Sequence, residues 1–189
     1  MKEKETGTWK IWAVTIFLFA IVVAATIRVS TLPVLNFTAK GSKVHIVIDP
    51  GHGGFDPGKV GTMGTLEKDV NLKISLKLRE ILTKSGYTVA MTREKDEALC
   101  GETTGKRKVE DLNARLAVID KEKPELTVSI HQNSYSAGTK GAQVFYYSGS
   151  EEGKRLANVL QETIKEEMGD GNHRVEKAND SYYMLKKSS

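Results

Sequence analysis

The sequence predicts an α/β domain in which helices cover the faces of a mostly parallel sheet. Short apolar segments with strand character alternate along the chain with longer segments whose apolar residues recur at helical spacing. The first strand candidate is an almost continuous apolar run that stops at a glycine-rich loop, as a strand buried on both faces does. The composition agrees, because 39% hydrophobic and 28% charged residues exclude wholesale disorder and a fibrous repeat.

The strand candidates are rich in β-branched or aromatic residues and are bounded by glycine, proline or polar residues. They lie at 44–49, 87–92, 126–130 and 142–147. Apolar residues at helical spacing indicate helices at 109–119 and at 156–164, and Ser150 is placed to cap the second of these.

The segment 66–84 fits two patterns. Every second residue from Val70 to Leu78 is apolar, as in a strand, but Val70, Ile74 and Leu78 also share one face of a helix. The segment is far longer than a typical strand, so we predict a helix.

An uncharged apolar segment at 11–27 precedes the domain, with Lys10 before it and Arg28 after it. As a helix it would be about 26 Å long, enough for a slightly thinned bilayer, and the lysines ahead of it favour a cytoplasmic N-terminus. A cleavable signal peptide is the alternative, because Val23-Ala24-Ala25 within this segment offers small residues near where a signal peptidase would cut. In both cases the domain is exported, either anchored to the membrane or secreted.

We therefore expect a cytoplasmic N-terminus (1–10), a transmembrane anchor or signal segment (11–27), a linker (28–42) and the α/β domain (43–189). Most of the net charge of +4 comes from the N-terminal part, so the domain has no basic stripe and we expect no nucleic-acid partner. The single cysteine, Cys100, forms no internal disulfide, which fits a bacterial surface protein.

Three residues that can ligate a metal follow the ends of predicted elements. His52 comes directly after the first strand, Glu67 opens the following helix, and His131 ends the third strand. In open α/β sheets the functional groups collect beyond the carboxyl ends of the strands, and two imidazoles with one carboxylate are the ligands of a catalytic zinc. Taken singly, each has a structural alternative, a backbone hydrogen bond for a histidine or a favourable helix dipole for the glutamate. Asp49 is a candidate for holding the free ring nitrogen of a ligating histidine.

These residues lie within motifs that occur together in one family. The motifs are Asp-Pro-Gly-His-Gly-Gly at 49–54, Leu-Glu-Lys-Asp-Val-Asn-Leu at 66–72, Met91-Thr92-Arg93, a helix with Arg115, and Ser-Ile-His-Gln-Asn-Ser at 129–134. With them the chain resembles the zinc-dependent N-acetylmuramoyl-L-alanine amidases of bacterial cell walls. The N-terminal segment and residues 141–147 most resemble the germination-specific members from spore-forming bacteria.

The resemblance implies a zinc ion held by His52, Glu67 and His131. Its substrate would be peptidoglycan, cut at the amide between the lactyl group of muramic acid and the L-alanine of the stem peptide. The spore cortex, where this cleavage precedes muramic lactam formation, is the expected location. Asn133, two residues after His131, is a candidate for a supporting or substrate-binding role.

The chain departs from the family near its end. The general base of these amidases is a glutamate on a late strand that follows the 183–185 region, so we expect it after Ser189 and identify no general base here. The resemblance therefore implies a C-terminally truncated domain without the last strand and helix, and impaired activity. The alternatives are a non-catalytic relic that binds zinc or peptidoglycan, and a zinc peptidase with the same ligands.

Overall fold

The computed structural model describes residues 44–101, 106–133, 140–169 and 171–188, and Lys43–Ser189 forms one compact unit. Within the described residues no helix is both long enough and apolar enough to cross a membrane. The predicted segments 1–10, 11–27 and 28–42 lie outside the described residues, so the anchor stays a prediction.

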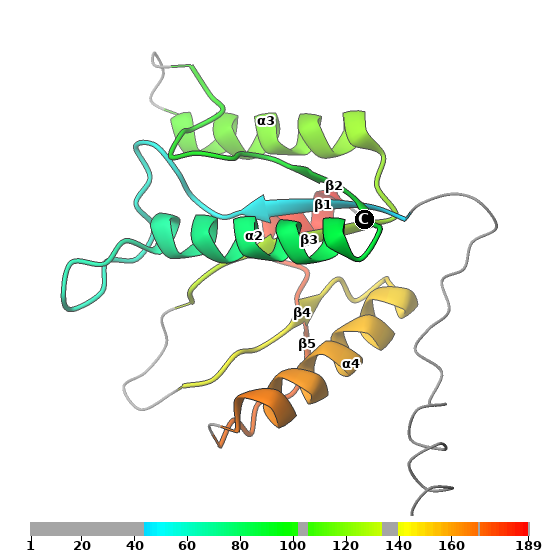
Figure 1. The fold of residues 1–189 in the computed structure, drawn as a ribbon. Coiled ribbons are helices and arrows are strands. Elements are labelled where there is room, and N and C mark those ends of the chain that lie inside the picture. The colour runs from blue at the N-terminus through cyan, green and yellow to red at the C-terminus, as the bar shows by residue number, and fades with distance from the viewer. Residues whose placement is uncertain (1–43, 102–105, 134–139, 170, 189) are drawn as a thin grey trace, which may run out of the picture. The chain divides into compact units, whose positions relative to one another are not determined.

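A three-stranded parallel sheet in the order β2-β1-β3 forms the centre of the fold (Figure 1). Its strands are β1 (His45–Pro50), β2 (Thr88–Met91) and β3 (Leu126–Ile130), close to the predicted ranges. The long helices are α2 (Glu67–Lys84), α3 (Arg107–Glu122) and α4 (Glu151–Met168), and α5 (Tyr183–Lys187) is a short helix near the end of the chain. The α/β fold with a parallel sheet and the helical interpretation of 66–84 are therefore confirmed.

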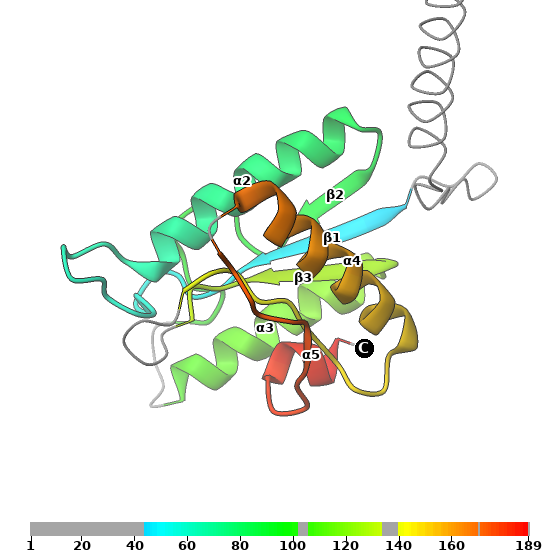
Figure 2. The same cartoon turned by 90° about the horizontal axis from the view of Figure 1, so that it is seen from below.

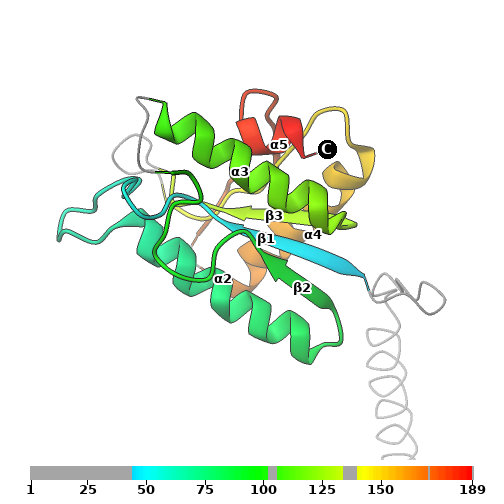
Figure 3. The same cartoon turned by 90° about the horizontal axis from the view of Figure 1, so that it is seen from above.

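Alternate residues of β1 pack against opposite layers. Ile46 and Ile48 form one apolar cluster with Met91 and the leucines of α2. Val47 points the other way, into a cluster with Ile119 of α3 and Met184 of α5. The sheet therefore lies between α2 on one face and α3 with α5 on the other, as Figure 3 shows.

The fourth predicted strand, 142–147, forms only the short β4 (Phe145–Tyr146) and does not join this sheet. It pairs in parallel with β5 (Lys177–Ala178), and β4 contacts α4; Figure 1 labels the three elements, and Figure 2 shows α4 from below. The residues before β4 also bond to α4, because the Gln161 side chain accepts from the Val144 backbone N–H at 2.8 Å and donates to the Ala142 carbonyl at 3.2 Å. The Val144 carbonyl accepts from the Lys177 N–H of β5 at 2.9 Å. Ser150 caps α4 as predicted, accepting a hydrogen bond from the Gly153 N–H at 2.9 Å.

Candidate metal centre

His52, Glu67 and His131 come together at the carboxyl edge of the sheet. One potential ligand atom from each of them lies within 4.8 Å of the other two. The strands explain this, because β1 and β3 are neighbours and the register puts Pro50 opposite Ile130, so that a histidine follows each strand at the same edge. The two imidazole rings meet edge to face with their centroids 4.9 Å apart.

Glu67 is 5% exposed and faces both histidines. Its Oε1 lies 3.2 Å from His52 Nε2 and 3.2 Å from His131 Nδ1. Burial raises the pKa of Glu67, but the backbone N–H groups of Lys59 and Gln132, at 2.8 and 2.9 Å, together with the histidines bring this pKa below its ordinary value. The carboxylate is therefore ionised near neutral pH.

The His52 ring is held from its other side by Asp56. His52 Nδ1 lies 3.0 Å from Asp56 Oδ2, which leaves Nε2 facing Glu67. Burial raises the pKa of Asp56, but its contacts to His52, to the Lys108 ammonium at 3.1 Å and to the Gly58 N–H keep this pKa below its usual range. Asp56 is thus an ionised carboxylate that orients a candidate ligand.

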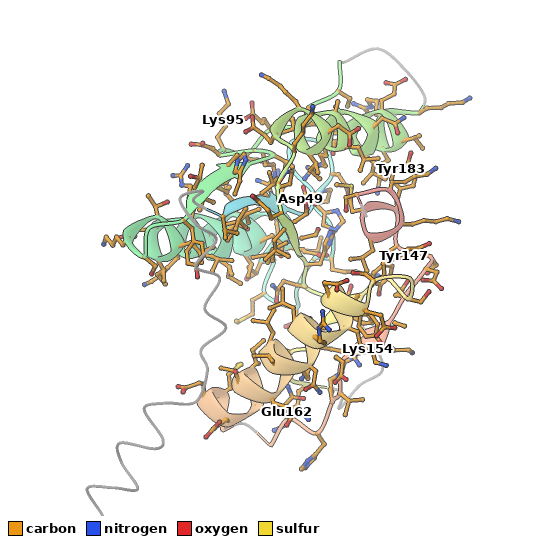
Figure 4. The ribbon with its side chains drawn as sticks, turned by 90° about the vertical axis from the view of Figure 1, so that its right-hand side faces the viewer. Asp49, Lys95, Tyr147, Lys154, Glu162 and Tyr183 are labelled. Carbon is orange, nitrogen blue, oxygen red and sulfur yellow. The ribbon has the colours of Figure 1, made fainter. Side chains whose placement is uncertain are left out.

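Asp49 does not have this role, which corrects the prediction from the sequence. It is 1% exposed and accepts hydrogen bonds from Thr92 Oγ1 at 2.7 Å, Ser129 Oγ at 2.8 Å and Arg115 Nη1 at 2.8 Å. Burial raises the pKa of Asp49, and the Arg115 guanidinium and these hydrogen bonds lower it below its ordinary value. Figure 4 shows Asp49 inside the domain, and the contact to His52 is made by Asp56.

Two buried arginines fix the loop that carries His52. Arg115 Nη1 and Nη2 donate to the carbonyls of Pro50 at 2.8 Å and His52 at 2.6 Å. Arg93 Nε and Nη2 donate to the carbonyls of Pro50 at 2.9 Å and Gly51 at 3.0 Å. The loop needs this support because His52 has φ +63°, a left-handed conformation that is costly for a residue with a side chain.

His131 lies directly against the backbone of this loop. A Cβ atom at residue 51 would overlap the His131 ring, so only glycine allows the approach at this position. Burial, and then the neighbouring His52, lower the pKa of His131, which favours the neutral imidazole that can ligate a metal.

An open cavity of about 380 Å³ leads to the three residues. It is mostly polar, and Lys59, Lys108 and Asn133 are among its lining residues. The supporting or substrate-binding role of Asn133 stays a prediction. A smaller and more apolar cavity of about 240 Å³ adjoins it, lined in part by Phe55, Leu112 and Met184.

Asp56, Lys108 and the loop contacts of the two arginines were not among the features predicted from the sequence. Asp56 follows His52 by four residues, and a tight turn joins them, since Gly53 N donates to the Asp56 carbonyl at 3.0 Å and Asp56 N donates to that of Gly53 at 3.0 Å. The glycine-rich composition of this segment was the available signal for such a turn.

Residues 46–189 match the family model described as N-acetylmuramoyl-L-alanine amidase. The chain is 38% identical over 143 residues to the germination-specific N-acetylmuramoyl-L-alanine amidase of Bacillus subtilis strain 168, which covers 74% of this chain and 60% of that relative. The chain thus spans about three fifths of the length of this curated relative.

Solved structures show the same likeness. The CwlD amidase from Clostridioides difficile, determined in complex with the GerS lipoprotein, is 37% identical with a TM-score of 0.74, over 78% of each chain. An N-acetylmuramoyl-L-alanine amidase of Nostoc punctiforme is 33% identical with a TM-score of 0.65, over 78% of this chain and 75% of that one.

Proposed function

The chain belongs to the N-acetylmuramoyl-L-alanine amidase family, and on that premise we propose that it hydrolyses the amide between the lactyl group of muramic acid and the L-alanine of the stem peptide in peptidoglycan. The observation that carries this proposal is the cluster of His52, Glu67 and His131 at the end of an open cavity. An accessible cluster of this kind suits a polymeric substrate, which must reach the reacting atoms from solvent.

The three side chains fit a zinc ion. Two imidazole nitrogens and one carboxylate oxygen form the donor set of catalytic zinc sites, in which a further position stays open for water or substrate. The ionised Glu67 and the lowered pKa of His131 support this role, because metal ligands must be deprotonated. When bound, zinc supplies Lewis-acid polarisation of the scissile carbonyl and lowers the pKa of water.

The residues around the cluster position the ligands. Asp56 fixes the His52 ring so that Nε2 faces the other ligands, and the backbone N–H groups of Lys59 and Gln132 hold the Glu67 carboxylate. Because these contacts fix the side chains through the protein's own groups, little side-chain ordering would be required when zinc binds.

Amide hydrolysis also requires a group that moves a proton from water to the leaving nitrogen. Among the described residues that line the cavity, the carboxylates are Glu67 and Asp56, and both are engaged by the contacts above. This observation favours, as a second candidate function, a protein that binds zinc or peptidoglycan without cleaving it.

The relatives suggest a setting for the activity. Similarity to a germination-specific amidase supports the spore cortex as substrate, and a cell-wall substrate supports an extracytoplasmic domain, 43–189, behind an anchor or signal segment at 11–27. The complex of the Clostridioides difficile relative with a lipoprotein supports a protein partner of that kind for this chain.

Mass spectrometry of the products released from purified peptidoglycan and from spore cortex tests the proposal. The zinc-loaded full chain should release free stem peptides and leave muramic acid without peptide, while Glu67→Gln should release none. Lys73→Gln, at an exposed position on α2, serves as the matched surface control.

The other products separate the alternatives. Protein that sediments with peptidoglycan and releases nothing would favour the non-catalytic function, and shortened stem peptides still attached to muramic acid would favour a peptidase. Release by Glu67→Gln at the rate of the unmodified chain would refute the assignment of the site.

A further inference from the structure

Two lysines line the larger cavity beside the candidate metal centre. Lys59 lies in the segment between β1 and α2, and Lys108 is the second residue of α3. The Lys108 side chain is 71% exposed and contacts Asp56, whereas within the described residues the Lys59 ammonium has no ion-pair partner. The cavity therefore presents at least one unpaired cation close to the cluster.

The charges inside the cavity favour an anionic ligand. Its carboxylates, Glu67 and Asp56, are already satisfied by backbone N–H groups, by His52 and by Lys108. Lys59 and Lys108 bring two positive charges to the lining, and a divalent ion held by the cluster would add to the positive potential of the cavity. A substrate carboxylate that reaches the lysines would gain from this potential.

The start of α3 is also basic. Lys106, Arg107 and Lys108 occupy the cap and first positions, where acidic residues stabilise a helix and basic ones oppose its dipole, and only Glu110 supplies acid in the first turn. Lys106 makes no side-chain cap hydrogen bond. Of these three residues, Lys108 lines the cavity and contacts Asp56, and the Arg107 guanidinium lies over the Phe55 ring at 4.5 Å.

We propose that Lys59 and Lys108 form a carboxylate-binding subsite that distinguishes a stem peptide with a free carboxylate from one in which it is amidated. The residue after L-alanine in peptidoglycan stems is a glutamate, which carries such a group close to the scissile amide. The inference rests on the proposed function, because it takes the stem peptide as the ligand of the cavity.

Isothermal titration calorimetry of the zinc-loaded full chain tests this subsite. The two ligands are muramoyl dipeptide analogues with a non-hydrolysable link in place of the scissile amide, which differ only in a free or amidated glutamate α-carboxyl group. For the unmodified chain we expect amidation to raise Kd about fivefold, the scale of one partly exposed ion pair. Salt at about 0.5 M should reduce this ratio.

Substitutions assign the effect to the lysines. Lys59→Gln should bring the ratio of the two Kd values close to one, Lys108→Arg should keep it because the charge is retained, and Lys73→Gln should leave it unchanged. Equal affinities in the unmodified chain, a ratio that survives Lys59→Gln, or no binding of either ligand would overturn the subsite.

Different results would contradict the catalytic function and the carboxylate-binding subsite. Hydrolysis of peptidoglycan without discrimination between the two ligands would contradict the subsite alone. Discrimination without hydrolysis would support the subsite and contradict the catalytic function.

Discussion

Replacing Arg115 by leucine removes the cation that supports both the buried Asp49 and the loop of the candidate metal centre. The side chains of Arg115 and Asp49 are 2% and 1% exposed, and their closest atoms are 2.8 Å apart. Arg115 Nε also contacts Asp111 at 2.7 Å. Because the variant leaves Asp49 as a buried charge without its cation, it should lose about 3–5 kcal/mol of unfolding free energy.

Urea unfolding of the full chain, followed by far-UV circular dichroism, measures this loss. With a denaturant slope of about 2 kcal/mol/M, the midpoint should fall by about 1.5–2.5 M. Arg79→Leu is the matched control, because it removes an ion pair to Glu94 in which the side chains are 33% and 64% exposed. That variant should lose less than about 1 kcal/mol, and equal losses in both would refute the argument.

The pH dependence gives an independent check. In the unmodified chain, burial raises the pKa of Asp49, but Arg115 and the hydrogen bonds bring it below the unfolded value, so its stabilising effect is present above that value and lost as the pH falls through the folded pKa. In Arg115→Leu, burial should instead raise the pKa of Asp49 above the unfolded value. Protonation of Asp49 then removes the buried charge that destabilises the variant. The difference between the two proteins should therefore be smaller at about pH 4.5 than at about pH 7, and a constant difference would argue against a charge effect.

Three further substitutions test the candidate metal centre through zinc content and chelator competition, with Lys73→Gln as the surface control. His131→Ala should abolish stoichiometric zinc, and equal zinc in both proteins would remove the ligand assignment. Asp56→Asn should weaken zinc binding about tenfold, because the carboxylate that orients the His52 ring is lost. Unchanged zinc affinity would contradict this orienting role of Asp56. Gly51→Ala should lower zinc affinity by displacing the His131 ring, whereas Gly101→Ala, with open space around its Cβ and no positive φ, should have no effect.

The central sheet and its helices were predictable because their signals are local. Leu126–Ile130 is bounded by polar and turn-forming residues, and the predicted strand coincides with β3. The pairing of β4 with β5 was not predictable, because it joins residues far apart in the chain, and Gln161 of α4 bonds to the Val144 N–H and the Ala142 carbonyl beside it. A buried glutamine on a helix carries no sequence signal that identifies its partner.

The meeting of His52, Glu67 and His131 was predictable from the rule that functional groups follow parallel strands, whereas the partner of His52 was not assigned correctly. Strand periodicity shows why. Asp49 lies two residues after Val47, so both face α3, and there Asp49 meets Arg115. Asp56 reaches His52 only because the chain turns back between them, a geometry set by the left-handed backbone at His52 and the glycines that follow it.

The buried arginines connect the stability of the domain to the geometry of its candidate metal centre. Arg93 and Arg115 are both fully buried, and their guanidinium N–H groups donate hydrogen bonds to the carbonyls of Pro50, Gly51 and His52. These carbonyls belong to the backbone that places His52 and against which the His131 ring lies. A change at either arginine therefore moves the two histidines relative to each other, although neither arginine contacts an imidazole. The motifs containing Arg93 and Arg115 are thus part of the site through the backbone, so the candidate metal centre of three side chains depends on segments spread over the whole sheet.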